Sequence, residues 1–333
     1  MVFGIRLIIF IFPFSVFLGF VIDDFGSASE VKDGIFILGS WTEKDLNGIM
    51  KQSSKMQDVA QRIELLSGKF LNTKYEDSTL VGDITHPEEL VINLDGMDCF
   101  TFIDYVEAMQ LSDSYPMFID NIKRIRYQSG QVDYRKRNHF FTDWAVYNSA
   151  NIVDVTREVG GQGTRTVNKI LNKKADGRPY LPGIPVKERV VHYIPSESID
   201  DNVTGRLKTG DYIGIYTDKD GLDVSHTGVL IRKGDVVYLR HASSRKDNRR
   251  VVDEDLLAYM RDKPGLVVLV SKASSRVTFT CTPGVCAKLF GIIGKRIRSS
   301  QSAERGIRRL FISSPQRAVS APRVRTVVRL LTG

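Results

Sequence analysis

The chain has 333 residues, of which 42% are hydrophobic, and this size and composition exclude a wholly disordered protein. The formal net charge of +8 is unevenly placed, because residues 271–333 carry 13 Lys and Arg against the single acid Glu304, which leaves −4 on residues 1–270. A protein that holds a polyanion normally has its basic surface on the folded part. We therefore expect no specific nucleic-acid partner.

The N-terminus has the pattern of an export signal. Arg6 precedes an apolar run from Leu7 to Ile22, which Pro13 interrupts, and the small residues Gly26 to Ala28 follow it. The run is shorter than the roughly 20 residues that a membrane-spanning helix needs. We expect residues 1–28 to be a signal peptide or N-terminal anchor that engages the membrane during export.

Helical spacing dominates the first half of the chain. A helix is predicted to start at Thr42 to Asp45, and a second one at Cys99 with Asp98 as its N-cap. The apolar residues at helical spacing in the first helix are Leu46, Ile49, Met50, Met56, Val59, Ala60 and Ile63. In the second helix they are Cys99, Phe102, Ile103, Val106 and Met109. Further helices are predicted around Phe118 to Ile125 and at Val167 to Leu171.

The second half changes to short β-rich runs that Gly, Asp and Lys turns separate. Strands are predicted at Asp211 to Tyr216, Val224 to Ile231, Val236 to Ala242 and Leu266 to Val270. Helices followed by antiparallel strands indicate an α+β domain over residues 40–270. Residues 271–333 lose the alternation, and we expect them to form a basic, flexible C-terminal extension.

Three residues could carry chemistry together: Cys99, His226 and His241. If Lys233 and Gly234 form a two-residue hairpin loop, His226 lies directly opposite His241 on the same face of the sheet, with Cβ atoms about 5 Å apart. The helix start would favour the Cys99 thiolate and hold an oxyanion. His226 would act as the base, and His241 would orient it.

The other cysteines are Cys281 and Cys286, which are too few for a disulfide scaffold and could pair with each other. Each member of the constellation also has an ordinary structural interpretation: a lone Cys at a helix start is usually a small core residue, and a His in a strand is usually an interior or surface group. Only their combination favours catalysis.

Several separate motifs resemble the N-acetylmuramoyl-L-alanine amidase-like cysteine hydrolases, in the NlpC-type branch of the papain-like superfamily. They are Asp98-Cys99-Phe100-Thr101-Phe102, His139-Phe140-Phe141-Thr142-Asp143-Trp144, Leu181-Pro182-Gly183-Ile184-Pro185, Leu207-Lys208-Thr209-Gly210-Asp211, Gly221-Leu222-Asp223-Val224-Ser225-His226-Thr227-Gly228 and His241-Ala242-Ser243-Ser244. The resemblance spans roughly residues 40–270.

The resemblance implies a papain-like, NlpC-type fold with a helical N-terminal half on a small antiparallel sheet or half-barrel. It also implies a Cys-His-His triad, no metal or cofactor, and hydrolysis of the amide between N-acetylmuramic acid and L-alanine in peptidoglycan fragments. The protein would then be bacterial and periplasmic or associated with the cell envelope. Substrate-binding candidates are Asp98, which could instead only cap its helix, and Tyr134, Arg137, His139, Phe141, Asp143 and Trp144, of which Phe141 and Trp144 could equally be core residues.

Four alternatives stay open at this point. The enzyme could cut the γ-D-glutamyl bond of the same stem peptide with the same triad. Cys99, His226 and His241 could instead bind the zinc ion of a metal amidase. The protein could also be a non-catalytic wall-binding protein, or it could bind nucleic acid through residues 271–333.

Overall fold

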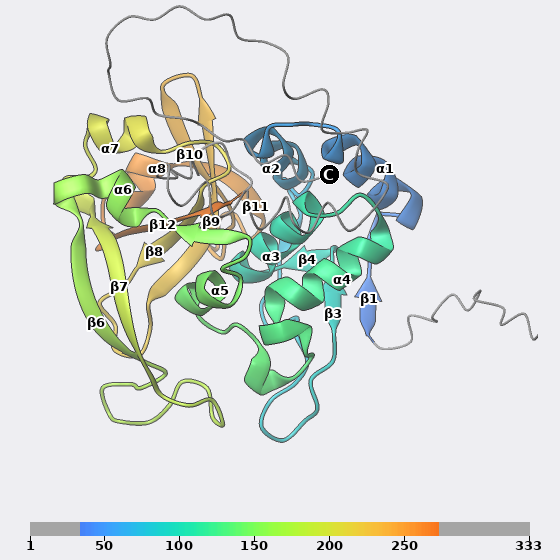
Figure 1. Ribbon diagram of the computed structural model, residues 1–333, viewed down its shortest axis with the longest axis horizontal. Coiled ribbons are helices and arrows are strands. Elements are labelled where there is room, and N and C mark those ends of the chain that lie inside the picture. Colours follow the sequence, from blue (N-terminus) through green and yellow to red (C-terminus); the bar gives the residue numbers. More distant parts are fainter. Residues whose placement is uncertain (1–33, 273–333) are drawn as a thin grey trace, which may run out of the picture. The chain divides into compact units, whose positions relative to one another are not determined.

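Helices make up most of the first part of the described chain, and strands make up most of the second (Figure 1). The computed structural model describes residues 34–272. The segment expected to direct export, residues 1–28, lies outside them, as do Cys281, Cys286 and all of the expected C-terminal extension beyond Lys272. Within residues 34–272, none of the helices has the length and apolar character to cross a membrane.

Two helices occupy the segment where the apolar spacing predicted one. The first, α1 (Glu43–Ser54), starts at a capping box between Thr42 and Asp45, as predicted. The second, α2 (Val59–Gly68), starts because the Asp58 side chain accepts a hydrogen bond from the Ala60 N–H. The single long helix was therefore a wrong prediction, since a local N-cap interrupts a stripe whose spacing continues across the break.

The helix that begins at Cys99 is confirmed. Two short parallel strand pairs lead to it, β1 (Ile35–Ile37) with β3 (Val91–Asn93) and β2 (Lys74–Tyr75) with β4 (Gly96–Met97). The remaining helices are α3 (Cys99–Gln110), α4 (Tyr115–Arg126), α5 (Phe141–Tyr147), α6 (Thr156–Gly160), α7 (Asp201–Arg206) and α8 (Leu256–Met260). The predicted helix around Phe118 is therefore also present, as α4.

An antiparallel sheet of eight strands forms the other part, in the order β11-β10-β9-β8-β12-β7-β6, with β5 paired to β12. Its strands are β5 (Ile152–Asp154), β6 (Arg165–Leu171), β7 (Lys187–Pro195), β8 (Tyr212–Tyr216), β9 (Val224–Lys233), β10 (Val236–Ala242), β11 (Val251–Asp255) and β12 (Gly265–Ser271). The four predicted strands correspond to β8, β9, β10 and β12. The structure is thus an α+β fold with a helical N-terminal part packed on an antiparallel sheet.

Strand β6 replaces the helix predicted at Val167 to Leu171. Val167, Lys169 and Leu171 turn inward while Asn168 and Ile170 are exposed, which is the two-residue period of a strand. The helical interpretation was wrong because five residues are too short to distinguish the two periods. Pairing of every residue of β6 with β7 fixes the strand conformation.

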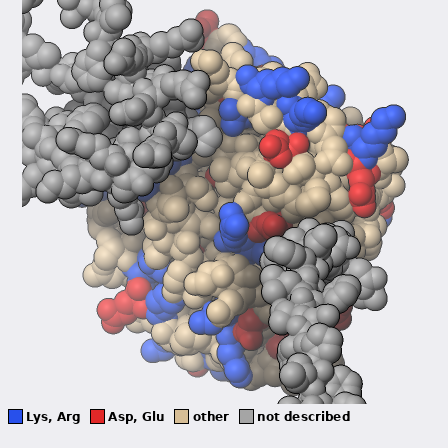
Figure 2. Space-filling view, turned by 45° about the vertical axis from the view of Figure 1, so that its right-hand side comes forward, with Lys and Arg blue, Asp and Glu red and all other residues tan. Residues whose placement is uncertain are grey.

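The sheet carries apolar side chains on both faces. Val229 and Ile231 of β9 pack with the helices, among them Phe102 and Val106 of α3. Leu230, between them in the sequence, packs on the opposite face in a second cluster that includes Leu256 of α8. On the surface seen in Figure 2, Lys and Arg lie beside Asp and Glu, and charges of one sign do not form a continuous area there.

Polar contacts fix α3 against its surroundings. The Thr227 hydroxyl of β9 donates to the Cys99 carbonyl at 2.7 Å, and the Tyr212 hydroxyl of β8 donates to Glu107 Oε2 at 2.7 Å. On the side of α4, the buried Asp104 accepts from Arg126 Nε at 2.8 Å and from Trp144 Nε1 at 3.1 Å. The start of α3 is therefore held firmly beside β9.

The buried Glu107 carboxyl should make stability depend on pH. Burial raises the pKa of Glu107 from 4.5 to about 7, so the folded state binds its proton more tightly than the unfolded state. The resulting stability, roughly 3 kcal/mol, is present below about pH 4.5 and is lost as the pH rises through about 7. Glu107→Gln should remove this slope and be the more stable protein above pH 7, as measured by urea unfolding.

The exposed Glu64 offers a control, because Glu64→Gln on α2 should leave the pH dependence of the parent unchanged. An unaltered pH profile in Glu107→Gln would contradict the assignment of this proton to Glu107.

Candidate active site

Cys99 is the first residue of α3, and Asp98 caps the helix from the position before it. Asp98 Oδ1 accepts from the backbone N–H groups of Phe100 at 2.9 Å and Thr101 at 2.7 Å, while the Thr101 hydroxyl accepts from the Asp98 N–H at 3.0 Å. The predicted N-cap is therefore confirmed. The thiol is half-buried at the positive end of the helix dipole.

The Cys99 thiol is neutral in the free protein. Burial raises its pKa to about 12, with the Asp98 charge acting in the same direction, and hydrogen bonds from Thr227 oppose them only in part. From its position at the helix start, Cys99 was predicted to be a thiolate. The effect of the helix start is outweighed here, so a nucleophilic Cys99 needs a base that removes its proton.

The two histidines of the sheet are in contact. His226 Nε2 lies 2.6 Å from His241 Nδ1, and the ring planes are almost perpendicular, at 88°. His226 is half-buried and His241 is buried, at 1% exposure. The prediction that both rings share one face of the sheet within hydrogen-bond reach is confirmed.

The predicted register that led to this contact is wrong. Lys233 pairs with Val236, so Gly234 and Asp235 form the loop in place of Lys233 and Gly234. Continuing this pairing puts Gly228 opposite His241, so that His226 is its diagonal neighbour. The two histidines remain on the same face because the shift is an even number of residues.

Two local features of β9 allow the diagonal contact. A Cβ on Gly228 would lie 2.7 Å from the Arg240 carbonyl oxygen and 3.0 Å from His241 Cβ, so only glycine leaves this space free. The pairing of β8 with β9 also shifts next to His226, where Ser225 is the extra residue of a β-bulge. Bulges turn the adjacent side chain, here that of His226.

Both histidines are neutral at pH 7. Burial, followed by the positive charges of Arg245 and Lys263, lowers the pKa of His226 to about 4. Burial, followed by the neighbouring His226 and by Arg245, lowers the pKa of His241 to about 3. A neutral imidazole is the form that a general base requires.

Three further residues surround the pair and were not found from the sequence. The centroid of the Tyr259 ring of α8 lies 5.2 Å from that of the His241 ring and 6.1 Å from that of the His226 ring. Glu254 of β11 lies 3.3 Å from His241 Nε2 through its Oε1, and its Oε2 binds Arg245 at 2.8 Å. Nothing in the short acidic run that contains Glu254 distinguishes it from a surface strand.

Three of the substrate-binding candidates line one cavity beside the start of α3. Asp98, Arg137 and His139 share this cavity of about 250 Å³ with Leu80, Phe100, Thr101, Asp104, Arg126 and Asn138. His139 Nε2 lies 2.8 Å from the Tyr134 carbonyl oxygen, and burial lowers the pKa of His139 to about 4. Arg137 binds Glu88 and the Gly82 carbonyl, so its charge is partly balanced.

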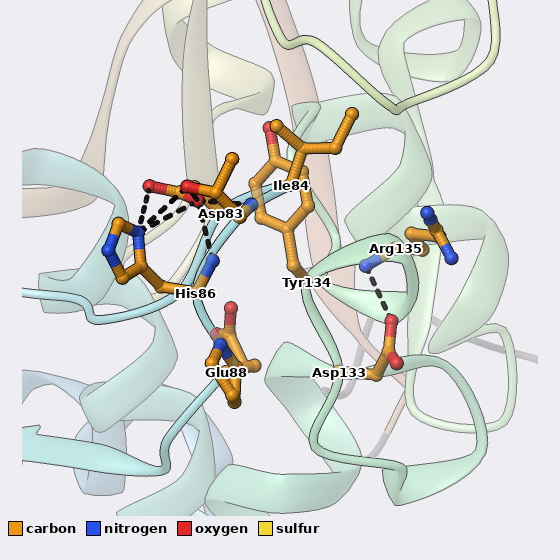
Figure 3. Close-up of a pocket in the computed structure, with 9 residues that line it drawn as sticks. Asp83, Ile84, His86, Glu88, Asp133, Tyr134 and Arg135 are labelled. Carbon is orange, nitrogen blue, oxygen red and sulfur yellow. Dashed lines mark hydrogen bonds and ion pairs between the residues drawn. The ribbon is translucent and has the colours of Figure 1, made fainter.

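Tyr134 belongs to a second cavity of similar size, which Figure 3 shows with Asp83, His86, Glu88 and Arg135. Its ring stands at 5.0 Å from that of His139, so the two cavities share a wall. Tyr134 is only 8% exposed, and most of its ring is packed.

Phe141 and Trp144 lie in the core, which is the second of the two interpretations left open for them, and Asp143 is buried as well. Phe141 and Trp144 stack on each other in the core with no exposed area. Asp143 is 4% exposed and binds Lys187 at 3.0 Å and also Arg189. The two aromatic rings are buried because they fill the core, and the Asp143 carboxylate is buried because two cations pair with it.

A zinc centre would need at least three His, Cys, Asp or Glu ligands that converge on one point. Between residues 34 and 272, no three His, Cys, Asp or Glu side chains converge as ligands, and the set Cys99, His226 and His241 is included in that statement.

Comparison with known proteins gives consistent results. The N-acetylmuramoyl-L-alanine amidase-like family matches residues 65–266. No curated protein sequence matches the chain. A crystal structure of an N-acetylmuramoyl-L-alanine amidase from Bacteroides uniformis has 29% identity and a TM-score of 0.56, covering 64% of this chain and 99% of its own.

Two other crystal structures are similar. A Legionella pneumophila protein of the DUF1460 family has 23% identity and a TM-score of 0.59, over 69% of this chain and 94% of its own, and shows the shared fold. A Bacteroides fragilis protein provisionally named a xylanase has 30% identity and a TM-score of 0.51, over 61% of this chain and 98% of its own. Because the family match extends over more than half of its residues, the chain belongs to the N-acetylmuramoyl-L-alanine amidase-like family.

Proposed function

We propose that this protein is a peptidoglycan hydrolase of the NlpC-type, papain-like class that cleaves the amide between N-acetylmuramic acid and L-alanine of the stem peptide. Cys99 is the nucleophile, His226 the general base and His241 the residue that orients it. The observation that carries the proposal is the 2.6 Å contact between His226 Nε2 on β9 and His241 Nδ1 on β10. Strand β9 is also the strand that binds the start of α3, through Thr227. The family supports the amide as the bond that is cut.

The free nitrogen of His226 defines the first step. Since Nε2 is engaged with His241, the proton of the Cys99 thiol goes to Nδ1. The sulfur then attacks the lactyl carbonyl of muramic acid. The oxyanion is held by the backbone N–H of Cys99, because Asp98 already occupies those of Phe100 and Thr101.

The proton then passes from His226 Nδ1 to the leaving nitrogen, so the C–N bond breaks and the stem peptide departs with a free L-alanine amine. A thioester to Cys99 remains. His226 next removes a proton from water, the hydroxide attacks the thioester, and the lactyl carboxylic acid leaves as the thiol is restored. Every proton moves through His226 Nδ1, and no cofactor enters the balance.

The cavity beside Asp98 is the place that we assign to the substrate. It lies next to Cys99 in the sequence through Asp98 and Phe100, and it offers the guanidinium donor of Arg137, the unpartnered carboxamide oxygen of Asn138 and the Asp98 carboxylate. Such groups suit the hydroxyl, amide and carboxylate groups of muropeptides. We further propose that residues 1–28 direct export to the periplasm or cell envelope of a bacterium.

Two other activities have weaker support. A γ-D-glutamyl endopeptidase would use the same three residues, so only its products differ. One similar structure is provisionally named a xylanase. A xylanase needs a pair of carboxyl groups across the glycosidic bond, whereas the three residues of this site are a thiol and two imidazoles. The family favours the amidase.

Cleavage of defined muropeptides should distinguish these reactions. The amidase releases an intact stem peptide with a free L-alanine amine, which mass spectrometry of the products identifies. Cys99→Ala should abolish the release, while circular dichroism stays unchanged because a half-buried thiol at a helix start contributes little packing. Full activity of Cys99→Ala would refute the cysteine mechanism.

The bond is tested separately from the nucleophile in the same assay. Fragments that contain diaminopimelate, with the muramoyl–alanine bond left whole, would assign the endopeptidase. Reducing sugars from xylan would assign the glycosidase.

The two histidines should differ in how much they matter. His226→Ala removes the proton carrier and should lower kcat by about 10²-fold or more. His241→Ala leaves the carrier in place and should lower kcat less, because it removes only the partner that orients the ring. His192→Ala is a control, since His192 contacts Thr166 on the distant strand β6. Equal losses in His226→Ala and His241→Ala would contradict the assigned roles.

The acid limb of kcat/KM should lie unusually low. A base works only when unprotonated, so activity should fall as the pH drops through about 4, the lowered pKa of His226, instead of near 6.5. The groups that face the ring are His241, Tyr259, Arg245 and Lys263. An acid limb near pH 6.5 in an enzyme that remains folded would show that His226 is not desolvated in this way.

A further inference from the structure

Glu254 belongs to a row of side chains that crosses three strands. Glu254 of β11 pairs with Leu239 of β10, which lies two residues before His241. On the other side of β10, Gly228 of β9 lies opposite His241, and His226 lies two residues before Gly228. His226, His241 and Glu254 are thus successive diagonal neighbours on one face of β9, β10 and β11. Their polar atoms form a continuous chain with separations of 2.6 Å and 3.3 Å.

The carboxylate is held in place from several sides. Its Oε1 accepts from the Ser243 hydroxyl at 3.4 Å and from Asn248 Nδ2 at 3.1 Å, and its Oε2 accepts from Arg245 Nη1 at 2.8 Å. Glu254 therefore cannot easily turn away from His241 Nε2. The side chain of Glu254 is largely buried, at 17% exposure.

This arrangement permits only one order of protons. A carboxylate accepts and cannot donate, so His241 Nε2 must carry the hydrogen in its bond to Glu254. In a neutral ring, His241 Nδ1 is then the acceptor, and His226 Nε2 must be the donor to it. The lone pair of His226 is left on Nδ1, the nitrogen that the mechanism requires to be basic.

We propose that Glu254 is a positioning residue that fixes the tautomers of His241 and, through it, of His226, so that the basic nitrogen of His226 is Nδ1, the one that His241 does not bind. The proposal rests on the function proposed above. Without Glu254, His241 could donate from Nδ1 to His226 Nε2, and the His226 proton would then sit on Nδ1, where it blocks the base.

Glu254 acts by the direction of its hydrogen bond and not by its charge. Arg245 binds the same carboxylate at 2.8 Å and offsets its negative charge. Burial and the nearby positive charges of Arg245 and Lys263 also disfavour a protonated His226, because they lower its pKa. Glu254 thus orders the protons without holding a proton on His226.

The ¹⁵N spectra of the histidine rings test the proposal without any substrate. In the full-length protein, both His226 and His241 should show a protonated Nε2 and an unprotonated Nδ1. The chain has only five histidines, so replacement of His226 and of His241 one at a time assigns the two signals. A protonated Nδ1 on either ring in the unaltered protein would overturn the proposal.

Glu254→Gln keeps the shape and permits either order, because an amide can donate as well as accept. The Nε2 tautomer of His226 should lose its dominance, and kcat should fall about tenfold or more with little change in KM. Glu254→Asp, which can only accept, should retain the native tautomers. Asn248→Ala is the matched control, since it removes a donor to the same oxygen but leaves both histidines untouched.

Unchanged ring spectra and unchanged kcat in Glu254→Gln would overturn the role of Glu254 and leave the amidase standing. Native tautomers that shift in Glu254→Gln, in a protein without amidase activity, would support the proton order while the proposed function fails. If Glu254→Gln did not fold, the spectra of the unaltered protein and of Glu254→Asp would still decide.

Discussion

The contact between the start of α3 and strand β9 is the constraint on which the rest of the site depends. Thr227 of β9 binds the carbonyl of Cys99, and the residue before Thr227 is His226. Any shift of the helix along the strand would therefore change the position of Cys99 relative to His226. The ties of Glu107 to Tyr212 and of Asp104 to Arg126 and Trp144 hold the helix against such a shift. Side chains of β8, α4 and α5 thereby fix the helix that begins at Cys99.

Burial sets the chemical character of the site. It raises the pKa of Cys99 and lowers that of His226, so both groups are neutral before substrate binds. In the proposed mechanism, the thiol proton therefore passes to His226 as the sulfur attacks. The helix dipole and the N–H of Cys99 would then act on the charge that develops on the substrate oxygen.

The sequence was sufficient to predict the fold class, the N-cap at Asp98, the helix at Cys99 and the shared face of the two histidines. The predicted hairpin register was wrong because turn preference does not distinguish Lys233-Gly234 from Gly234-Asp235 as the loop. The two histidines still share a face, because the register differs from the predicted one by two residues. Phe141 and Trp144 could not be assigned to core or cleft, since both surroundings favour aromatic rings. Glu254 was missed because its contact with His241 depends on the pairing of β11 with β10. Nothing in the acidic sequence of β11 predicts that pairing.

A covalent intermediate on Cys99 is the most direct test of this account. Unaltered enzyme would be quenched in acid during turnover of a defined muropeptide and digested, and the fragment that contains Cys99 would be weighed by mass spectrometry. If Cys99 is the nucleophile of an amidase, this fragment carries the muramoyl group as a thioester, with the stem peptide already released. An unmodified Cys99 during rapid turnover, or a stem-peptide fragment attached to it, would contradict the account.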